Sequence, residues 1–418
     1  MRGLVVLLFA ALYAASSMAA ADPGFATAGQ RLADLDWLVA KFEDKYAYRD
    51  KRNLDWKDIS RVYRDAAAQA NDKAAWVGVL EHVVAELYDH HASLGTNTSK
   101  SPQLVPSGTD IWAEVIAGSP AIVQVRPGSV AFKAGLRGGM VVRMIAEEPV
   151  AAAISRWRPR TLLKADAEAD SFALRVSLAG NRVDRRRFVA CAADDRCKTF
   201  DLDPVREQDA GERLTWRMVD GELGLVRIEN SLGDTGTIAD FDRALEKLKG
   251  AKGFVLDLRN TPSGGNTGTA EPILGRFISE RQGYQRVFEP GPGRTFERDS
   301  WTKEVAPRGT TVGQPLVVLV DHWTGSMGEG MAIGLHAMKR ATIVGTRMAG
   351  LLGGTGSFEL PNTRVSVRFP IERLNHLDGT PRELFEPGTL VGATSGGDDP
   401  ILAAGLEELR KELTARSP

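Results

Sequence analysis

Apolar positions between residues 24 and 98 recur at intervals of three and four, the spacing that gathers side chains on one face of a helix. One set lies before the polar stretch 50–53 and a second set lies after it. The members are Leu32, Leu35, Leu38, Val39 and Phe42, followed by Val77, Leu80, Val83, Val84 and Leu87. Gly95 then supplies a stop signal. We therefore expect a helical region over residues 22–100.

From about Ser107 the pattern changes to short apolar runs that are interrupted by Gly and Pro, which is typical of β-structure. Residues 121–125 alternate as a strand does, and residues 127–142 indicate a turn, a short helix and a further strand. Two more strands are expected at 174–178 and 187–190. These elements predict a small β-rich domain over residues 101–203.

The last half of the chain, residues 204–418, opens with two apolar strands joined through Asp220-Gly221, a strong signal for a type I′ hairpin turn. Fully apolar short runs then alternate with segments of helical period. The expected strands are 254–258, 315–320 and 341–344, and the expected helices are 238–248, 272–278 and 328–338. Buried strands that alternate with helices predict a layered α/β core with parallel strands.

The first 21 residues have the composition of a secretory signal peptide. One positive charge at Arg2 precedes an apolar run, and small residues follow before Asp22. The run is shorter than the roughly 20 apolar residues that a transmembrane helix needs, and no later segment is apolar enough to span a bilayer. We expect cleavage after Ala19 or Ala21 and an exported protein, with the bacterial periplasm as its compartment.

Composition narrows the classes of function. The chain of 418 residues is 43% hydrophobic and 26% charged, as a folded protein is, and its formal net charge of −1 gives no electrostatic footprint for nucleic acid or an anionic membrane. Two cysteines cannot build a zinc cage, so we expect no metal or cofactor. In an oxidising compartment Cys191 and Cys197, which flank a turn, favour a local disulfide; two free thiols are the alternative.

The most informative stretch for chemistry is 320–330, where a buried strand runs into a helix through Thr324-Gly-Ser-Met-Gly328. A serine at such a junction exposes its hydroxyl above the strand ends, beside helix amides that can stabilise an oxyanion. An ordinary helix N-cap is the alternative interpretation of Ser326. The motif differs by one residue from the G-x-S-x-G turn of α/β-hydrolases.

A second stretch, 253–266, is a buried strand that ends at the pair Gly264-Gly265. Glycine lets backbone amides approach a substrate carbonyl because no Cβ stands in the way. A tight strand-to-helix turn without any binding role would use the same residues.

Together these segments resemble the serine peptidase family that includes the C-terminal (tail-specific) processing peptidases and the tricorn core protease. The resemblance implies a Clp-protease/crotonase-like layered peptidase core, and residues 127–150 are similar to the PDZ domain of that family. The motifs that carry the resemblance are Asp257-Leu-Arg-Asn260 with Gly264-Gly265, Thr324-Gly-Ser-Met-Gly-Glu329, Val344-Gly-Thr346 with Gly350, and Leu377-Asp-Gly379 through Pro387.

The family divides by its general base. Processing peptidases use a Ser–Lys dyad, and in this chain the lysine would be expected at about position 351. Leu351 stands there, and a leucine cannot take a proton. The tricorn-like branch takes a histidine from the amino-terminal region in a D-x-H pattern, which Asp89-His90-His91 matches. The resemblance therefore implies His91 as base, whereas the pattern alone favours a helix-end histidine that satisfies backbone carbonyls.

The resemblance also supplies a third residue, a glutamate near the carboxyl end. Glu383 matches it and Glu386 is the fallback, although the local spacing is shorter than that of the family. A serine needs a neighbouring base to become nucleophilic at neutral pH, and a carboxylate that fixes the imidazole completes the relay. The expected oxyanion donors are the amides of Met327 and of Gly264 or Gly265.

These expectations describe a metal-free peptidase that hydrolyses peptides or unfolded proteins through an acyl-enzyme. Two alternatives stay open. One is a catalytically silent relative that binds peptides or apolar ligands, since Met140 replaces an aspartate of the PDZ pattern and makes peptide capture by strand addition a hypothesis. The other is an esterase that uses Ser326 with His376 and Glu359. His322 either contacts substrate or lies at a surface strand end, packing explains His336, and loop support explains Asp257 and Arg259.

Overall fold

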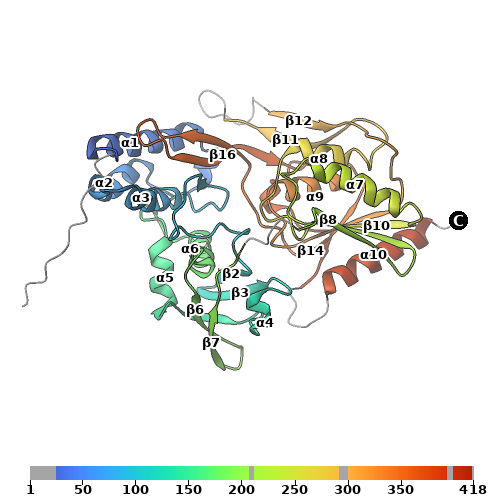
Figure 1. Ribbon diagram of the computed structural model, residues 1–418, viewed down its shortest axis with the longest axis horizontal. Helices are drawn as coiled ribbons and strands as arrows, with labels where there is room; N and C mark the ends of the chain where they lie inside the picture. The colour runs from blue at the N-terminus through green and yellow to red at the C-terminus, as the bar shows by residue number, and fades with distance from the viewer. Residues whose placement is uncertain (1–24, 207–210, 291–299, 393–398, 417–418) are drawn as a thin grey trace, which may run out of the picture.

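The computed structural model describes residues 25–206, 211–290, 300–392 and 399–416, in which strands form three sheets (Figure 1). The signal-like residues 1–21 lie outside the described part of the chain. Within that part, no helix combines the length and the apolar character that crossing a membrane requires.

The helical pattern expected before residue 98 forms three α-helices: α1 Ala28–Lys45, α2 Ile59–Gln69 and α3 Lys73–Ala85. Thr27 caps α1 by accepting the N–H of Gln30, and Asp72 caps α3 by accepting the N–H of Ala75. The apolar face of these helices is buried against residues from much later in the chain. The shared core includes Leu35, Leu38, Phe42, Leu80, Leu360, Val367 and Phe369.

The middle of the chain forms a sheet of its own in the order β2-β3-β4-β6-β7, with β5 paired to β4. Cys191 at the end of β6 is joined by a disulfide to Cys197 at the start of β7, which confirms that pairing. The elements are β2 Ile111–Ile116, β3 Ser119–Val125, α4 Val130–Lys133, β4 Val141–Ile145, β5 Glu148–Pro149, α5 Val150–Trp157, α6 Ala167–Ala179, β6 Arg186–Cys191 and β7 Cys197–Leu202.

The strand expected at 174–178 is wrong, because these residues belong to helix α6. Leu174, Val176 and Leu178 are spaced two residues apart, as on one face of a strand. Leu174 and Leu178 are also four residues apart, which is the i, i+4 spacing of one face of a helix. The helix prevails because Asp166 caps it through the N–H of Glu168 and because alanines precede the apolar run.

Strands between residues 214 and 390 build the main sheet, which has the order β17-β14-β13-β10-β9-β8. All neighbours are parallel except β8 and β9, which form the expected hairpin through Asp220 and Gly221, both at positive φ. The strands are β8 Leu214–Val219, β9 Leu223–Ile228, β10 Gly253–Asp257, β13 Leu316–Val320, β14 Thr342–Gly345 and β17 Thr389–Leu390.

Helices cover both faces of the main sheet, which confirms the layered α/β prediction (Figure 1). Three helices share a core with one face: α7 Gly236–Lys247, α8 Thr267–Leu274 and α9 Met327–Ala337. On the other face, Ile401 and Leu409 of α10 (Pro400–Arg416) pack on Val317 and Leu319.

A third sheet links the amino-terminal helices to the α/β core. Its order is β1-β16-β11-β12, with β15 also paired to β16. Figure 1 shows β16 running from α1 toward the core. One end of this strand pairs Arg368 with Ser93 of β1, and the other pairs Asn375 with Arg286 of β11. The elements are β1 Ser93–Leu94, β11 Gln282–Phe288, β12 Ser300–Val305, β15 Gly354–Glu359 and β16 Ser366–Asn375.

Candidate active site

Ser326 lies at the corner between β13 and α9. Its backbone has φ 49° and ψ −108°, a conformation that L-residues other than glycine rarely adopt and that marks functional turns. Every other residue from 315 to 335 is buried, whereas Ser326 is partly exposed. The fold therefore presents one serine to solvent from an otherwise enclosed strand–turn–helix unit.

A buried carboxylate holds this corner in place. Glu329, which is 0% exposed, accepts the backbone N–H of Ser326 at 2.7 Å and the backbone N–H of Gly350 at 2.9 Å. Burial raises the pKa of Glu329 to about 7, although Arg382 and the two N–H groups favour the ionised form. Glu329 therefore joins the serine turn to the loop that follows β14.

Gly264 approaches Ser326 more closely than any residue with a side chain could. A Cβ on Gly264 would lie 2.4 Å from Ser326 Cβ, 3.0 Å from its Oγ and 3.1 Å from the backbone nitrogen of Met327. The φ of Gly264 is 66°, which also favours glycine. Gly264 and the backbone nitrogen of Met327 thus lie beside the side chain of Ser326.

The loop 349–353 packs against the other side of the serine turn. Ala349 donates its N–H to the carbonyl of Thr324 at 3.0 Å. The Cδ1 atom of Leu351 lies 3.2 Å from where a Cβ on Gly325 would stand. Leucine therefore occupies the place next to the nucleophile turn at which the processing peptidases are expected to carry their lysine.

His91 reaches the same loop from the amino-terminal region. Its Nδ1 lies 2.5 Å from the carbonyl oxygen of Leu352, so that Nδ1 carries the proton and Nε2 keeps its lone pair. The backbone N–H of His91 donates to Asp89 at 2.8 Å, and the other oxygen of Asp89 accepts the Tyr46 hydroxyl at 3.0 Å. The pairing of β1 with β16 immediately after this segment brings it to the core.

The surroundings of His91 keep its imidazole neutral. Burial, together with the guanidinium groups of Arg382 and Arg368, lowers the pKa of His91 to about 3, while the backbone carbonyls of residues 352 and 353 act in the opposite direction. A neutral imidazole with an unprotonated Nε2 is the form that a general base requires. Burial raises the pKa of Asp89 to about 6.

The two candidate acids near the carboxyl end, Glu383 and Glu386, follow Arg382 in the chain. This buried guanidinium donates to the carbonyls of Leu351 at 2.7 Å and Gly353 at 2.8 Å, and so fixes the loop on which His91 rests. The neighbouring Glu383 accepts the Tyr48 hydroxyl at 3.4 Å, and burial raises the pKa of its carboxyl group. Glu386, the fallback, is exposed and forms a surface ion pair with Arg347.

The residues assigned to the esterase alternative lie elsewhere. His376 Nε2 lies 3.0 Å from the Nδ1 atom of His336, near the carboxyl end of α9. At the helical rise of 1.5 Å per residue, that end is on the order of 15 Å from Ser326. Glu359 forms an ion pair with Arg364. This arrangement argues against a Ser326–His376–Glu359 relay.

The remaining candidates have local partners. His90 accepts a hydrogen bond from Arg175 at 2.9 Å, and the buried His322 lies 2.7 Å from the carbonyl of Arg347 through Nδ1. Arg259 forms a bidentate pair with Asp257 at 2.9 and 2.7 Å, which agrees with a role in loop support. Across the residues that the structure describes, no group of His, Cys, Asp or Glu side chains could hold a metal ion.

Sequence reasoning missed two residues that shape the site, Glu329 and Arg382. Glu329 ends the segment Thr324-Gly-Ser-Met-Gly-Glu329, but an acid in the first turn of a helix is favourable in any case, so the sequence does not single it out. Arg382 directly precedes Glu383, and no sequence signal marks its contacts with residues 351 and 353. The role of the Leu352 carbonyl leaves no trace in the sequence, because any residue carries that group.

Comparisons with known proteins bear on the family and on the fold. Residues 222–387 match the model of peptidase family S41. The carboxy-terminal processing protease CtpA of Bacillus subtilis (strain 168) is 32% identical over 149 residues, which are 35% of this chain and 30% of that protein. The chain therefore matches less than a third of the length of that curated relative.

Solved structures share the fold over most of the chain. The photosystem II D1 C-terminal processing protease is 18% identical, with a TM-score of 0.55 and coverage of 87% of this chain and 93% of that one. Mature CPAF is 15% identical, with a TM-score of 0.59 and coverage of 92% and 96%. Residues 222–387 thus resemble peptidase family S41 in sequence, and most of the chain shares the fold of these solved structures.

Proposed function

We propose that this chain is an exported serine peptidase that hydrolyses peptide bonds through an acyl-enzyme on Ser326, with His91 as general base. The supporting observation is the loop 349–353. Gly350 bonds Glu329, which holds the Ser326 turn, and two residues later the carbonyl of Leu352 bonds the imidazole of His91. One short loop thus supports both reacting groups.

The reaction begins when Oγ of Ser326 attacks the carbonyl carbon of the scissile bond while Nε2 of His91 takes the hydroxyl proton. The tetrahedral intermediate collapses as the imidazolium gives that proton to the leaving amine. Water, deprotonated by the same nitrogen, then attacks the acyl-enzyme and releases the new carboxyl group together with Ser326.

The oxyanion is stabilised by backbone N–H groups beside the serine. Met327 is the first residue of α9, where helix amides have no acceptor within the helix. The N–H of Gly264 donates to the carbonyl of Thr261 at 3.0 Å, so we assign the second donor to Gly265. Two such donors, set in place before the reaction, favour the transition state over the bound substrate.

Glu383 completes the relay in this proposal without touching the imidazole. The Leu352 carbonyl already orients Nδ1 of His91. Tyr48 lies between the loop 349–353 and the carboxyl group of Glu383. The Tyr48 ring is 3.1 Å from where a Cβ on Gly353 would stand, and the Tyr48 hydroxyl bonds Glu383. The carboxylate would stabilise the imidazolium through its field. With leucine at 351, the chain would follow the histidine-dependent branch of the family.

Export is part of the proposal and has two supports. The first 21 residues have the charge, apolar run and small residues of a signal peptide. The disulfide between Cys191 and Cys197 is of a kind that persists in oxidising compartments. Peptides and unfolded proteins are the proposed substrates, and the bacterial periplasm is the proposed location.

The decisive experiment combines labelling by a fluorophosphonate probe with hydrolysis of an unfolded protein. Ser326→Ala should abolish both, whereas Ser279→Ala, which changes an exposed serine away from the site, should retain both. His91→Ala should lower both by at least about a hundredfold, and His376→Ala should not. Undiminished turnover in Ser326→Ala would refute the proposal. Peptide binding by the native chain without labelling would favour the silent relative.

A further inference from the structure

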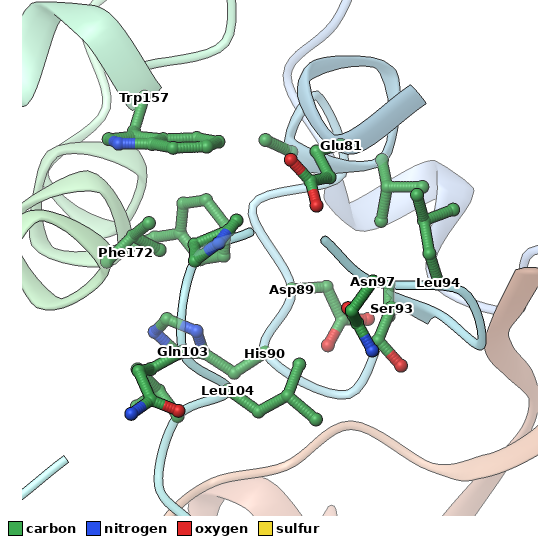
Figure 2. A pocket seen from close by; sticks show the side chains of 16 residues that line it. Glu81, Asp89, His90, Ser93, Leu94, Asn97, Gln103, Leu104, Trp157 and Phe172 are labelled. Atoms are coloured by element: carbon green, nitrogen blue, oxygen red, sulfur yellow. The ribbon is translucent and has the colours of Figure 1, made fainter. Parts of the chain in front are cut away.

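A hollow lies behind the segment that carries His91. It measures about 570 Å³ including its open mouth, and it is enclosed by α3, by the connection 89–105 and by the helices α5 and α6 (Figure 2). This volume includes open solvent at the mouth, so the enclosed part is smaller. The hollow is separate from the Ser326 corner, because no residue of the serine turn or of the loop 349–353 lines it.

The walls of this hollow are mainly apolar and aromatic. Trp157 of α5 and Phe172 and Val176 of α6 form one side, and Leu94 and Leu104 contribute from the connection 89–105. Figure 2 shows the Glu81 carboxyl group directed into the space between Trp157 and Leu94. A carboxyl group among such walls is the polar feature that would select a ligand.

Glu81 lacks a compensating cation in the described part of the chain. The Ser101 hydroxyl bonds its carboxyl group, but Oε1 is buried and has no hydrogen-bond partner there. The other acid of the lining, Asp89, already accepts Tyr46 and His91. A buried carboxylate oxygen that is left unpaired is costly, and a ligand cation would remove that cost.

We propose that this hollow binds a small apolar ammonium, with its aryl or alkyl group against Trp157 and Phe172 and its nitrogen donating to Glu81. The carboxylate of Glu81 would repel an anion. A neutral molecule would leave Oε1 of Glu81 without a charge-assisted hydrogen bond. Charge complementarity therefore selects an amine over an isosteric alcohol.

The position of the hollow connects its ligand to the peptidase site, a step that rests on the proposed function. Asp89 and His90 form part of the wall, and the next residue, His91, bonds the Leu352 carbonyl. Asp89 also holds the backbone N–H of His91. A ligand that shifts this wall shifts the base, so that occupancy should change the rate at which Ser326 is acylated.

Calorimetric titration of the mature chain with phenethylamine and with 2-phenylethanol tests the binding step. The amine should bind about tenfold more tightly or better, as a charge-assisted bond implies. Glu81→Gln should remove this preference, whereas Glu280→Gln, which changes an exposed acid elsewhere, should retain it. Equal affinities for the two compounds, or an equal loss in both variants, would overturn the proposal.

A variant that fills the hollow and an activity measurement complete the test. Val176→Phe should weaken the binding of the amine about tenfold or more, and undiminished binding in this variant would place the ligand elsewhere. Fluorophosphonate labelling of Ser326 should change at least twofold at saturating amine. An unchanged labelling rate would overturn the coupling. Because calorimetry needs no catalysis, failure of the binding step is distinguishable from failure of the peptidase proposal.

Discussion

The backbone N–H of Ser326 donates to the carboxylate of Glu329 at 2.7 Å, across one turn at the start of α9. The same carboxylate accepts the N–H of Gly350, so one buried charge sets the serine corner and its neighbouring loop together. The positive φ of Ser326 is unfavourable for a residue with a Cβ, and such a conformation persists only where its surroundings fix it. Glu329 supplies that fixation.

This relationship predicts opposite effects of pH on activity and stability. Only the ionised carboxylate accepts both N–H groups, so kcat/KM should fall as pH drops through about 7, the pKa to which burial raises Glu329. The same raised pKa means that the folded state retains a proton that the unfolded state loses above about 4.5. The contribution of Glu329 to the free energy of unfolding should therefore fall by about 3 kcal/mol as pH rises from 4.5 to 7.

Glu329→Gln is the variant that checks this prediction. Urea unfolding of both proteins at pH 5 and pH 8 should show that the variant loses less stability on going to pH 8 than the native chain does. Its labelling rate at pH 8 should be about ten- to hundredfold lower, because the amide NH₂ group faces a backbone donor. A native pH dependence of stability in the variant would contradict the assignment.

The local part of the site was predictable because its signals are local. The apolar strand 316–320, the small residues that follow it and the helix after Ser326 lie within one short stretch, and so does the Gly264-Gly265 strand end. The serine corner and the glycine approach follow from these stretches alone. The alternation of apolar strands with helices likewise predicted the parallel core and the helices on both faces.

The remaining part depends on pairing between distant segments. His91 meets Leu352 because β1 joins β16, and no pattern in either strand of this pair specifies that register. Residues 174–178 form a helix although their alternation suggests a strand, because their spacing fits both and the helix cap at Asp166 decides between them. Arg382 bonds the backbone carbonyls of residues 351 and 353. Every residue carries a carbonyl, so the residue types at these two positions do not indicate the contacts.

Gly264→Ala should impair the site more than the fold. The new Cβ would lie 2.4 Å from Ser326 Cβ, which is closer than Cβ atoms approach one another in proteins, and 3.1 Å from the Met327 nitrogen, which is a tight contact. We expect labelling and hydrolysis to fall by at least about a hundredfold, comparable to the loss of an oxyanion donor. Gly221→Ala is the matched control, since its φ of 74° imposes a similar backbone penalty while its Cβ would meet nothing within 4 Å. Equal activity loss in both variants would count against a steric effect at the serine.

Arg382→Met should loosen the loop on which His91 rests. The substitution leaves the carbonyls of Leu351 and Gly353 without their buried donor, a change that costs about 1–3 kcal/mol for each unsatisfied group. The melting temperature and the labelling rate should therefore both fall. Arg281→Met, which removes an exposed guanidinium, should change neither measurably. Unchanged labelling in the Arg382 variant would show that the loop keeps the imidazole in place without this contact.

Replacing Cys191 and Cys197 together by serine should separate stability from activity. The disulfide closes a loop with a sequence separation of 6, and loop closure of that length restricts the unfolded chain by about 2 kcal/mol. The bond lies at the β6–β7 turn, in a sheet that contains neither Ser326 nor His91. Chemical denaturation should thus show a loss of about this size in the free energy of unfolding, while the rate of fluorophosphonate labelling stays native. A matching loss of labelling in the folded variant would mean that this hairpin influences the serine corner, which the contacts of the described residues do not predict.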